Sequence, residues 1–331
     1  MGGLIILISV VVTSLFFIGR FPKMIPVLFL ILGFGIIGFL DDYLKVVLRR
    51  SDGLYPKQKM LGQIIVTAVF VVYLWIQDPS SLEILIPFSG GKVLSGDWVR
   101  IASAVIAFPA IIGTVNGVNF TDGLDGLATG VTTMAAVFFT AASVTLGAGI
   151  EPLTAAVTGA LIGFLLFNVY PAKVFMGDTG SLALGGLLAA TAMVTKQELL
   201  LILIGGVFVI EVLSVIIQVT YYKRTKKRIF RMAPIHHHFE AGGMKETSVV
   251  LMMWGIAFIC ALRPVCCVGC CDMENVLIIG GARSGIAAAR LLRAHGCAVT
   301  LTDSREVKEK HELEQAWRAR RRRRTSGLAA A

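Results

Sequence analysis

Two adjacent carboxylates stand at the end of a long apolar block in this 331-residue chain. Asp41 and Asp42 directly follow the apolar residues 25–40, and a charged group at the edge of a membrane span is costly and therefore a functional candidate. Adjacent helical residues point about 100° apart, so the two carboxylates face different partners. We expect one to bind a metal or act as a base while the other positions Lys45. A solvated helix end is the alternative, although the helix dipole disfavours Asp there.

A second polar cluster lies between two apolar blocks and contains Asn116, Asn119, Asp122 and Asp125. Asp122 and Asp125 are three residues apart, so they share one face if the segment is helical. A turn with a helix cap is the simpler explanation, because Asn, Asp and Gly favour both. Four polar side chains exceed what one cap needs, and the cluster is therefore predicted to bind a polar ligand.

A third polar segment follows the next apolar block and contains Asn168, Phe175, Gly177 and Asp178. A helix N-terminus with glycines can bind a phosphate group, because its free backbone N–H groups point toward the ligand. Capping of the following helix is the alternative role for Asp178. Phe175 is suited to stacking on a nucleobase, and a position at the membrane interface explains it about equally well.

Three consecutive histidines, His236, His237 and His238, lie in a fourth segment between Pro234 and Glu240. Neighbouring residues on one helix or strand point in different directions, so three adjacent histidines rarely bind one ion. Binding of a polar substrate is therefore favoured over a zinc site. A loop at the membrane interface without a chemical role is the alternative.

Magnesium is the cofactor that these segments predict. Mg²⁺ prefers carboxylate and phosphate oxygens and keeps several waters, which suits the aspartates of the four segments and a diphosphate substrate. Such an ion polarises phosphoryl oxygens and neutralises a leaving group. No loop of the form G-x-x-x-x-G-K-[ST] occurs in the four segments, so ATP hydrolysis by that route is not supported.

Long apolar blocks must position these segments. The chain is 56% hydrophobic and only 16% charged, whereas soluble domains carry about 25% charged residues. A bilayer core takes about 20 apolar helical residues. The blocks therefore predict an all-α polytopic membrane protein with about nine transmembrane helices, near residues 4–19, 25–40, 61–76, 100–118, 127–147, 152–170, 181–195, 199–220 and 248–262.

Basic residues give the predicted orientation. The loops 41–59 and 221–245 are rich in Lys and Arg, and the positive-inside rule places both in the cytoplasm. Counting spans from there puts segments 116–126 and 168–180 on the same side, so the four polar segments share one face. Residues 77–98 fall outside, where alternating apolar residues and a Ser-Gly-Gly turn predict a small hairpin.

The four segments, in this order between these spans, resemble the polyprenyl-phosphate N-acetylhexosamine-1-phosphate transferase superfamily. Within it, they are most similar to the bacterial branch that transfers phospho-N-acetylmuramoyl-pentapeptide. The run Met-Ala-Pro-Ile-His-His-His separates this branch from relatives that use other sugars. The resemblance covers about residues 1–262 and is carried by Asp41–Lys45, Asn116–Ala128, Phe167–Gly185 and Arg231–Glu240.

The resemblance implies a reaction in peptidoglycan synthesis at the cytoplasmic face of the bacterial inner membrane. UDP-N-acetylmuramoyl-pentapeptide and undecaprenyl phosphate would give lipid I and UMP. By the same resemblance the catalytic residues are Asp41, Asp42 and Asp178. Asp178 would ligate Mg²⁺, and Asp41 would act as a base or, in a two-step scheme, as the nucleophile.

The resemblance also assigns binding residues and a homodimer. The substrate-binding residues that it implies are Lys45 beside the diphosphate, Asn168, Phe175 and Gly177 around the uridine, and Asn116, Asn119, Asp122, Asp125, His236, His237 and His238 in the remaining polar pocket.

Both ends of the resembling region depart from the family pattern. Met1-Gly2-Gly3 looks like the interior of the family's Pro-Thr-Met-Gly-Gly motif, so the family's first span and a lysine-bearing loop are expected to be missing and activity to be impaired. Arg263-Pro264 is expected to cut the last span short.

The composition changes after Leu262. Residues 263–272 form a Cys-rich junction in which a zinc site is a weak alternative, because Cys267 and Cys270 have no second pair at zinc-site distance. Residues 273–315 read as one β-α-β unit and resemble the N-terminal edge of UDP-N-acetylmuramoyl-alanine–D-glutamate ligases, without the ligase machinery. Residues 316–331 form an Arg-rich tail that is predicted to be disordered. A frameshift or fusion of two cell-wall genes would explain the junction.

Three other functions fit the sequence less well than a transferase. The net charge of +10 does not favour nucleic-acid binding, because the basic residues of the membrane part sit at span ends. An ion-coupled transporter usually places its carboxylates near the bilayer midplane within inverted repeats, and neither is seen here. A membrane anchor for a soluble domain fits the incomplete tail poorly. A related transferase for a different UDP-sugar is the nearest alternative.

Overall fold

The structure is a computed structural model that describes residues 2–49, 53–89, 92–268, 275–279 and 298–302. The chain divides into two compact units, residues 1–271 and 272–331. The first unit contains all the predicted site residues.

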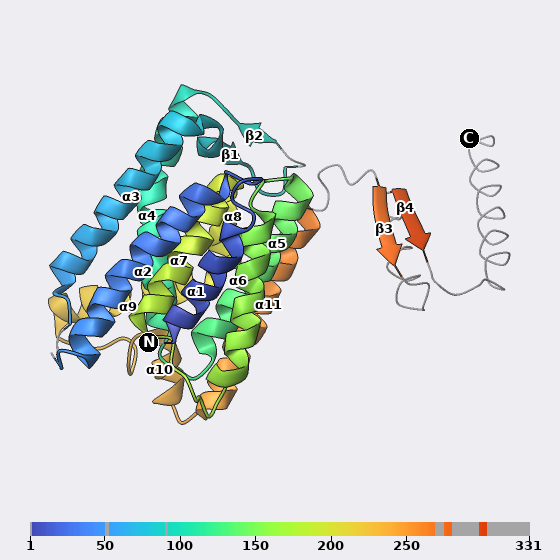
Figure 1. Ribbon diagram of the computed structural model, residues 1–331. Coiled ribbons are helices and arrows are strands. Elements are labelled where there is room, and N and C mark those ends of the chain that lie inside the picture. Colours follow the sequence, from blue (N-terminus) through green and yellow to red (C-terminus); the bar gives the residue numbers. More distant parts are fainter. Residues whose placement is uncertain (1, 50–52, 90–91, 269–274, 280–297, 303–331) are drawn as a thin grey trace, which may run out of the picture. The chain divides into compact units, whose positions relative to one another are not determined.

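The first unit is a helical bundle, as predicted (Figure 1). Its apolar blocks become long helices because a helix satisfies every backbone polar group within its own segment. In chain order the helices are α1 (Gly3–Leu15), α2 (Met24–Val46), α3 (Pro56–Gln77), α4 (Asp97–Thr121), α5 (Leu127–Leu146), α6 (Glu151–Asn168), α7 (Gly177–Val194), α8 (Glu198–Ile204), α9 (Gly206–Thr225), α10 (Ile235–Glu240) and α11 (Glu246–Val268).

Six of these helices are long and apolar enough to cross a membrane, namely α2, α3, α4, α5, α6 and α9. The helices α1 and α11 add shorter apolar stretches. The prediction of a polytopic all-α membrane protein is therefore confirmed.

Two predicted spans differ from the structure. The span 199–220 is not one helix, because it is broken at Gly205 into α8 and α9. The last span does not end before Arg263-Pro264, since α11 continues to Val268.

The helix α7 forms the centre of the bundle. Every residue from Thr179 to Val194 is buried, and the helix packs chiefly against α2 and α4 (Figure 1). A Cβ on Gly186 would lie 2.6 Å from the ring of Phe34 on α2, so only a residue without a side chain permits this approach. Small residues are common at helix contacts in membrane bundles, because the hydrophobic effect does not drive helices together in lipid and close van der Waals packing does.

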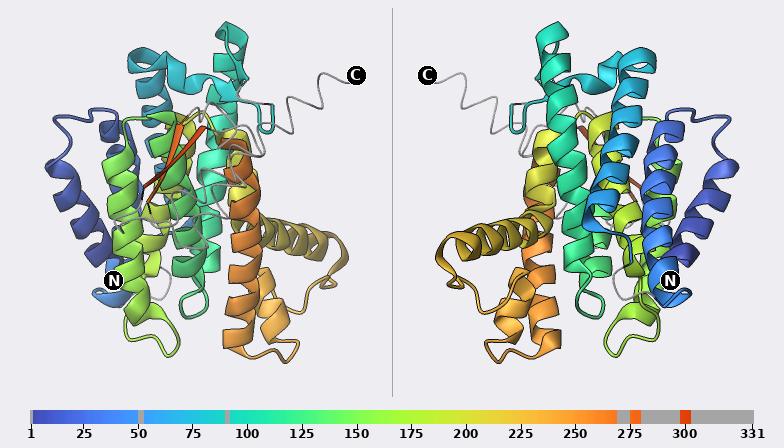
Figure 2. Two further views of the ribbon diagram at one scale, coloured as in Figure 1. Left: turned by 90° about the vertical axis from the view of Figure 1, so that its right-hand side faces the viewer. Right: turned by 90° about the vertical axis from the view of Figure 1, so that its left-hand side faces the viewer.

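The helix α9 departs from the direction of its neighbours and projects sideways from the bundle (Figure 2). Only 22% of its most apolar window is buried. Its C-terminal turn carries Lys223 and Arg224, and the short helix α10 with the three histidines packs back against it.

The predicted hairpin between α3 and α4 is confirmed. A 3₁₀ turn (Pro79–Leu82) leads into β1 (Ile84–Leu85), which pairs antiparallel with β2 (Val93–Leu94).

The second unit contains two described strands. The strands β3 (Asn275–Ile279) and β4 (Ala298–Thr302) pair in parallel, with Asn275 opposite Ala298. The predicted turn and helix between them, residues 269–274 of the Cys-rich junction and the Arg-rich tail lie outside the described residues.

Replacing Gly38 on α2 with Ala is expected to destabilise the bundle. A Cβ at this position would overlap the carbonyl group of Asp178 and lie 2.7 Å from the amide nitrogen of Thr179. Backbone atoms cannot move aside as a flexible side chain can, and overpacking of this kind costs about 1–3 kcal/mol. Thermal unfolding in detergent should show a lower midpoint for Gly38→Ala.

Gly113→Ala on α4 is the matched control, because nothing lies within 4 Å of its added Cβ. Its midpoint should equal or exceed that of the wild type, since Ala favours a helix over Gly. Equal midpoints for the two variants would contradict the close approach of α2 to α7.

Candidate active site

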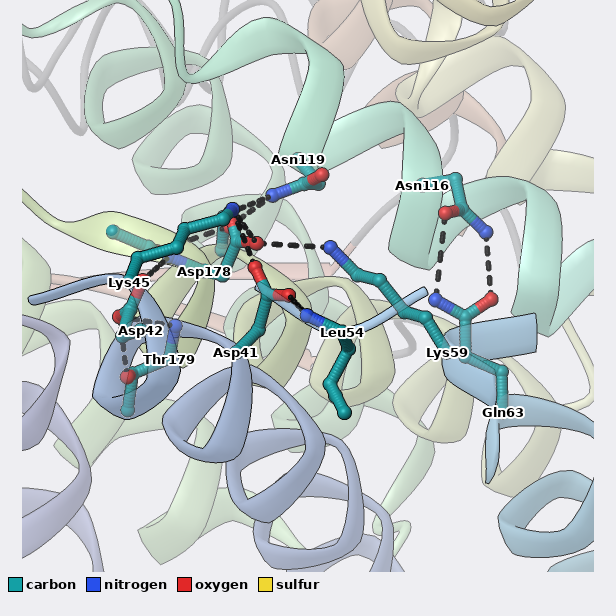
Figure 3. Close-up of polar contacts among 12 residues, drawn as sticks. Asp41, Asp42, Lys45, Leu54, Lys59, Gln63, Asn116, Asn119, Asp178 and Thr179 are labelled. Atoms are coloured by element: carbon teal, nitrogen blue, oxygen red, sulfur yellow. Dashed lines mark hydrogen bonds and ion pairs between the residues drawn. The ribbon is translucent and has the colours of Figure 1, made fainter. Parts of the chain in front are cut away.

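Polar residues from α2, α3, α4 and α7 meet where the C-terminal end of α2 reaches the first turn of α7 (Figure 3). The end of α4 contributes Asn119, and the beginning of α3 contributes Lys59. The sequence prediction that the first, second and third segments share one face of the bundle agrees with these contacts.

Asp42 caps α7 from a neighbouring helix. Its carboxylate accepts hydrogen bonds from the backbone N–H groups of Asp178 and Thr179, at 3.1 and 3.0 Å, and from the Thr179 hydroxyl at 2.6 Å. A carboxylate at this place satisfies N–H groups that have no partner within the helix and interacts favourably with the positive end of its dipole. Asp42 therefore fixes α7 to α2, and Asp178 does not cap its own helix.

Asp178 projects from that first turn into a set of hydrogen-bond donors. Its Oδ2 lies 2.9 Å from Lys59 Nζ and 3.3 Å from Lys45 Nζ. Its Oδ1 accepts a hydrogen bond of 2.8 Å from the Asn119 side-chain amide. The Asp178 side chain keeps 18% of its surface exposed, so a ligand can reach it.

Asp41 lies beside Asp178 and shares Lys45 with it. Lys45 Nζ forms an ion pair with Asp41, one helical turn earlier on α2. The other oxygen of Asp41 accepts a hydrogen bond of 2.7 Å from the backbone N–H of Leu54. One ammonium group therefore bridges the two carboxylates, and both lysines stand where anionic phosphate groups would be attracted.

Asn116 and Asn119 lie one turn apart on α4 and have different roles. Asn119 also donates to the Ser181 hydroxyl at 2.9 Å. Asn116 forms a reciprocal amide pair with Gln63 of α3, in which its own N–H donates at 2.8 Å. Asn116 therefore joins α4 to α3, whereas Asn119 contacts the carboxylate cluster.

Asp122 and Asp125 follow the end of α4. Burial, together with the negative charges of Asp178 and Asp42, raises the pKa of Asp122 to about 8. A carboxyl group with this pKa is mostly protonated at pH 7 and can donate a hydrogen bond. Asp125 accepts a hydrogen bond of 2.9 Å from the Ala172 backbone, and Glu246 accepts one from the Asp125 backbone, so Asp125 ties the second segment to the third.

Asn168 holds the loop that precedes α7. Its amide donates to the Val174 carbonyl at 2.9 Å and its oxygen accepts from the Thr129 hydroxyl. Phe175 at the end of this loop is 66% exposed, which leaves its ring free to stack on a ligand. Gly177 has a φ of +73°, and a Cβ there would lie 2.6 Å from Asp42 Oδ2, so this position needs glycine.

The three histidines do not act as one set. His236 is fully buried, and its ring lies against that of His237, with 4.1 Å between centroids and a tilt of 52° between the ring planes. His238 accepts a hydrogen bond from the Arg231 backbone at 3.0 Å, which is a local structural role. A Cβ on Gly123 would lie 2.5 Å from His236 Nε2 and 3.3 Å from His237 Nε2, so two of the histidines adjoin the turn that begins with Asp122.

The carboxylate cluster fits a divalent cation completed by its substrate. Within the described ranges, no three His, Cys, Asp or Glu side chains form a ready metal cage. Mg²⁺ is usually held by one or two carboxylates with waters and substrate phosphates, which matches Asp178 and Asp41. The buried Oδ2 of Asp41 makes an ion pair with the Lys45 ammonium group, so this oxygen already lies where a positive charge is favoured.

Four residues of this site were not predicted from the sequence: Lys59, Gln63, Thr179 and Ser181. Lys59 was visible only as one basic residue of a cytoplasmic loop. Gln63 is a fully buried amide within an apolar helix, and a polar residue inside a predicted span is a signal that could have identified it.

Comparison with known proteins agrees with this geometry. Residues 24–196 match the family described as Glycosyl transferase family 4. The chain is 49% identical over 259 residues to a phospho-N-acetylmuramoyl-pentapeptide-transferase of Acetivibrio thermocellus, which covers 77% of each chain. It is 46% identical over 276 residues to the protein of that name from Bacillus subtilis, which covers 80% of this chain and 82% of the relative.

The chain belongs to the phospho-N-acetylmuramoyl-pentapeptide transferase family. The matched family region begins at the first residue of α2 and ends just after α7, so it contains Asp41, Asn119 and Asp178. The predictions of a membrane-bound phosphosugar transferase and of a place in peptidoglycan biosynthesis are confirmed at the level of this family. The residues labelled in Figure 3 all lie within this matched region.

Removing the Thr179 hydroxyl is expected to loosen the junction of α2 and α7. Thr179→Val keeps the shape of the side chain but takes away the 2.6 Å hydrogen bond to Asp42. Loss of a buried hydrogen bond to a charged group costs about 1–3 kcal/mol. The thermal unfolding midpoint of Thr179→Val should fall accordingly.

Thr133→Val provides the comparison, since the Thr133 hydroxyl donates to the Thr129 carbonyl within the same helix. Its midpoint should stay close to that of the wild type. A Thr179→Val midpoint no lower than that of Thr133→Val would show that the cap is not important for stability.

Proposed function

We propose that the chain transfers phospho-N-acetylmuramoyl-pentapeptide from its UDP carrier to undecaprenyl phosphate, with Mg²⁺, to give lipid I and UMP. An oxygen of the lipid phosphate forms a bond to the sugar-bearing phosphorus, and the bond from that phosphorus to the UMP oxygen breaks. The observation that carries the proposal is the cluster of Asp41, Asp178, Lys45 and Lys59, in which two carboxylates and two ammonium groups converge at one helix terminus.

The two lysines hold the diphosphate in this proposal. Each now contacts Asp178, and an incoming diphosphate offers more negative charge than one carboxylate. A charge-assisted hydrogen bond from an ammonium to a phosphate is among the stronger contacts in proteins. Asn119 holds the other oxygen of Asp178 and so keeps the carboxylate aimed at the same place.

Asp178 and Asp41 would hold the magnesium ion. The ion would polarise the phosphoryl oxygens and stabilise the departing UMP. Lys45 forms ion pairs with both Asp41 and Asp178. Asp41 is therefore placed to act as the base for the lipid phosphate or as the nucleophile. Asp42, with both oxygens engaged by the first turn of α7, is assigned a positioning role beside them.

The site is proposed to face the cytoplasm. The segment from Lys223 to Lys245 that adjoins the histidines is rich in Lys and Arg, and such loops remain on the cytoplasmic side. The nucleotide substrate would approach from that side, and the lipid phosphate would enter from the surrounding membrane. Phe175, exposed beside the first turn of α7, is proposed to stack on the uracil ring.

The second unit is proposed to be a fragment similar to the first domain of UDP-N-acetylmuramoyl-alanine–D-glutamate ligases. The parallel pairing of β3 and β4 supports this proposal, because parallel neighbours need a crossover connection between them. No ligase activity is assigned to it.

Asp178→Asn is expected to lower the rate of UMP release at least about 100-fold, as loss of a group that stabilises transition-state charge commonly does. The assay supplies the purified chain with UDP-N-acetylmuramoyl-pentapeptide, undecaprenyl phosphate and Mg²⁺. Removal of Mg²⁺ with EDTA should abolish release, and renewed Mg²⁺ should restore it.

Asp97→Asn is the control, because the Asp97 side chain is 92% exposed at the other end of α4. Its rate should stay within about twofold of the wild type, as expected for a surface change far from the site. Equal rates for Asp178→Asn and the wild type would overturn the proposal. Faster release from a different UDP-sugar would instead favour the related transferases that the sequence left as the alternative.

A further inference from the structure

A carboxylate–imidazole contact is buried between α9 and α10, outside the cluster of Figure 3. Nδ1 of His236 lies 3.1 Å from Oε1 of Glu211, and both side chains are 0% exposed. In the described ranges no side-chain nitrogen or oxygen of either residue has a hydrogen-bond partner, so each residue has the other as its close polar neighbour. An acidic group inside an apolar helix is costly to bury, so the two groups depend on each other.

The histidine of this pair supports a second, accessible histidine. The ring of His236 contacts that of His237 at a tilt of 52°. The His237 side chain is 25% exposed, and its Nδ1 lies 2.9 Å from Glu240. The Nε2 atoms of both rings approach Gly123, where an added Cβ would meet each of them. Contacts therefore connect Glu211 through His236 both to His237 and to the turn that follows Asp122.

We propose that Glu211 is a positioning residue, which orients His236 and through it the exposed ring of His237 toward bound nucleotide-sugar substrate. This inference rests on the proposed function. His236 has no exposed surface, so it supports the binding site without touching the ligand. The turn that begins with Asp122 adjoins His237 and leads toward Asp178, where the diphosphate is proposed to bind. His237 would then contact a polar group in the sugar–peptide portion of the substrate.

The geometry favours orientation over simple packing. A buried side chain that only filled space would be better served by an apolar residue of similar volume, because desolvating a carboxylate costs more than it gains unless it has a defined partner. A carboxylate that accepts from one ring nitrogen fixes both the tautomer and the plane of an imidazole. The ring of His237 lies against that of His236, tilted by 52°, so its position depends on where the His236 ring is held.

Glu211→Gln keeps the size of the side chain and removes its charge. It is expected to raise the KM for UDP-N-acetylmuramoyl-pentapeptide about tenfold, by analogy with loss of the carboxylate behind a ligating histidine, while kcat changes less than about threefold. In a chain that already carries His236→Gln, the same substitution should leave KM unchanged, because its effect passes through His236.

Glu198→Gln is the matched control. Glu198 is also a buried carboxylate, with Ser103 as its partner at 3.1 Å, but it lies just beyond the far end of α7. Its KM should equal that of the wild type.

Additive effects of Glu211→Gln and His236→Gln, or a fall in kcat alone, would overturn the positioning role. If the Gln variant does not fold, Glu211→Asp, which keeps the charge on a shorter side chain, should raise KM to a smaller extent.

A spectroscopic measurement tests the pairing without turnover. In ¹⁵N-histidine-labelled chain in lipid nanodiscs, the Nδ1 resonance assigned to His236 by its absence from His236→Gln should shift in Glu211→Gln and stay unchanged in Glu198→Gln. An unshifted resonance would overturn the pairing even in an active enzyme. A shifted resonance in a chain that releases no UMP would support the pairing while the proposed function fails.

Discussion

The site depends on how closely α2 can approach the first turn of α7. Asp42 reaches across to the free N–H groups of that turn, and Gly38 and Gly177 leave no side chain in the way. A capping carboxylate usually belongs to the helix it caps, whereas here it comes from a helix more than 100 residues earlier in the sequence. The consequence is that Asp41, the preceding residue of α2, is placed directly beside Asp178 in the first turn of α7.

The charges at this junction are arranged for an anionic ligand. Lys45 and Lys59 both contact Asp178, and the positive end of the α7 dipole lies behind them. Near a bilayer, salt screens these interactions less than in water. The positive groups therefore attract a diphosphate, and the ion pairs with Asp178 resist disruption. The protonated state favoured for Asp122 avoids a further negative charge beside the same cluster.

Much of this fold could be predicted from the sequence, because apolar blocks of about 20 residues leave little choice but helices. Asp41, Asn119 and Asp178 could be identified from their motifs and the family resemblance. The partners of these residues could not be predicted, since the sequence of α3 does not tell which of its residues face α4, although Gln63 stands out as a polar residue within a predicted span. Glu211 carried a signal, an acid within a predicted span, that was overlooked. The break at Gly205 follows from two adjacent glycines. Such a local feature is lost when hydropathy is averaged over the length of a span.

Binding of Mn²⁺ in place of Mg²⁺ tests whether the α2–α7 junction builds a site for a divalent cation. Electron paramagnetic resonance would count bound Mn²⁺ in the purified chain with UDP-N-acetylmuramoyl-pentapeptide present. The account predicts that the wild type binds Mn²⁺, that Asp178→Asn does not, and that Asp97→Asn behaves as the wild type. Equal Mn²⁺ binding by wild type and Asp178→Asn would contradict it.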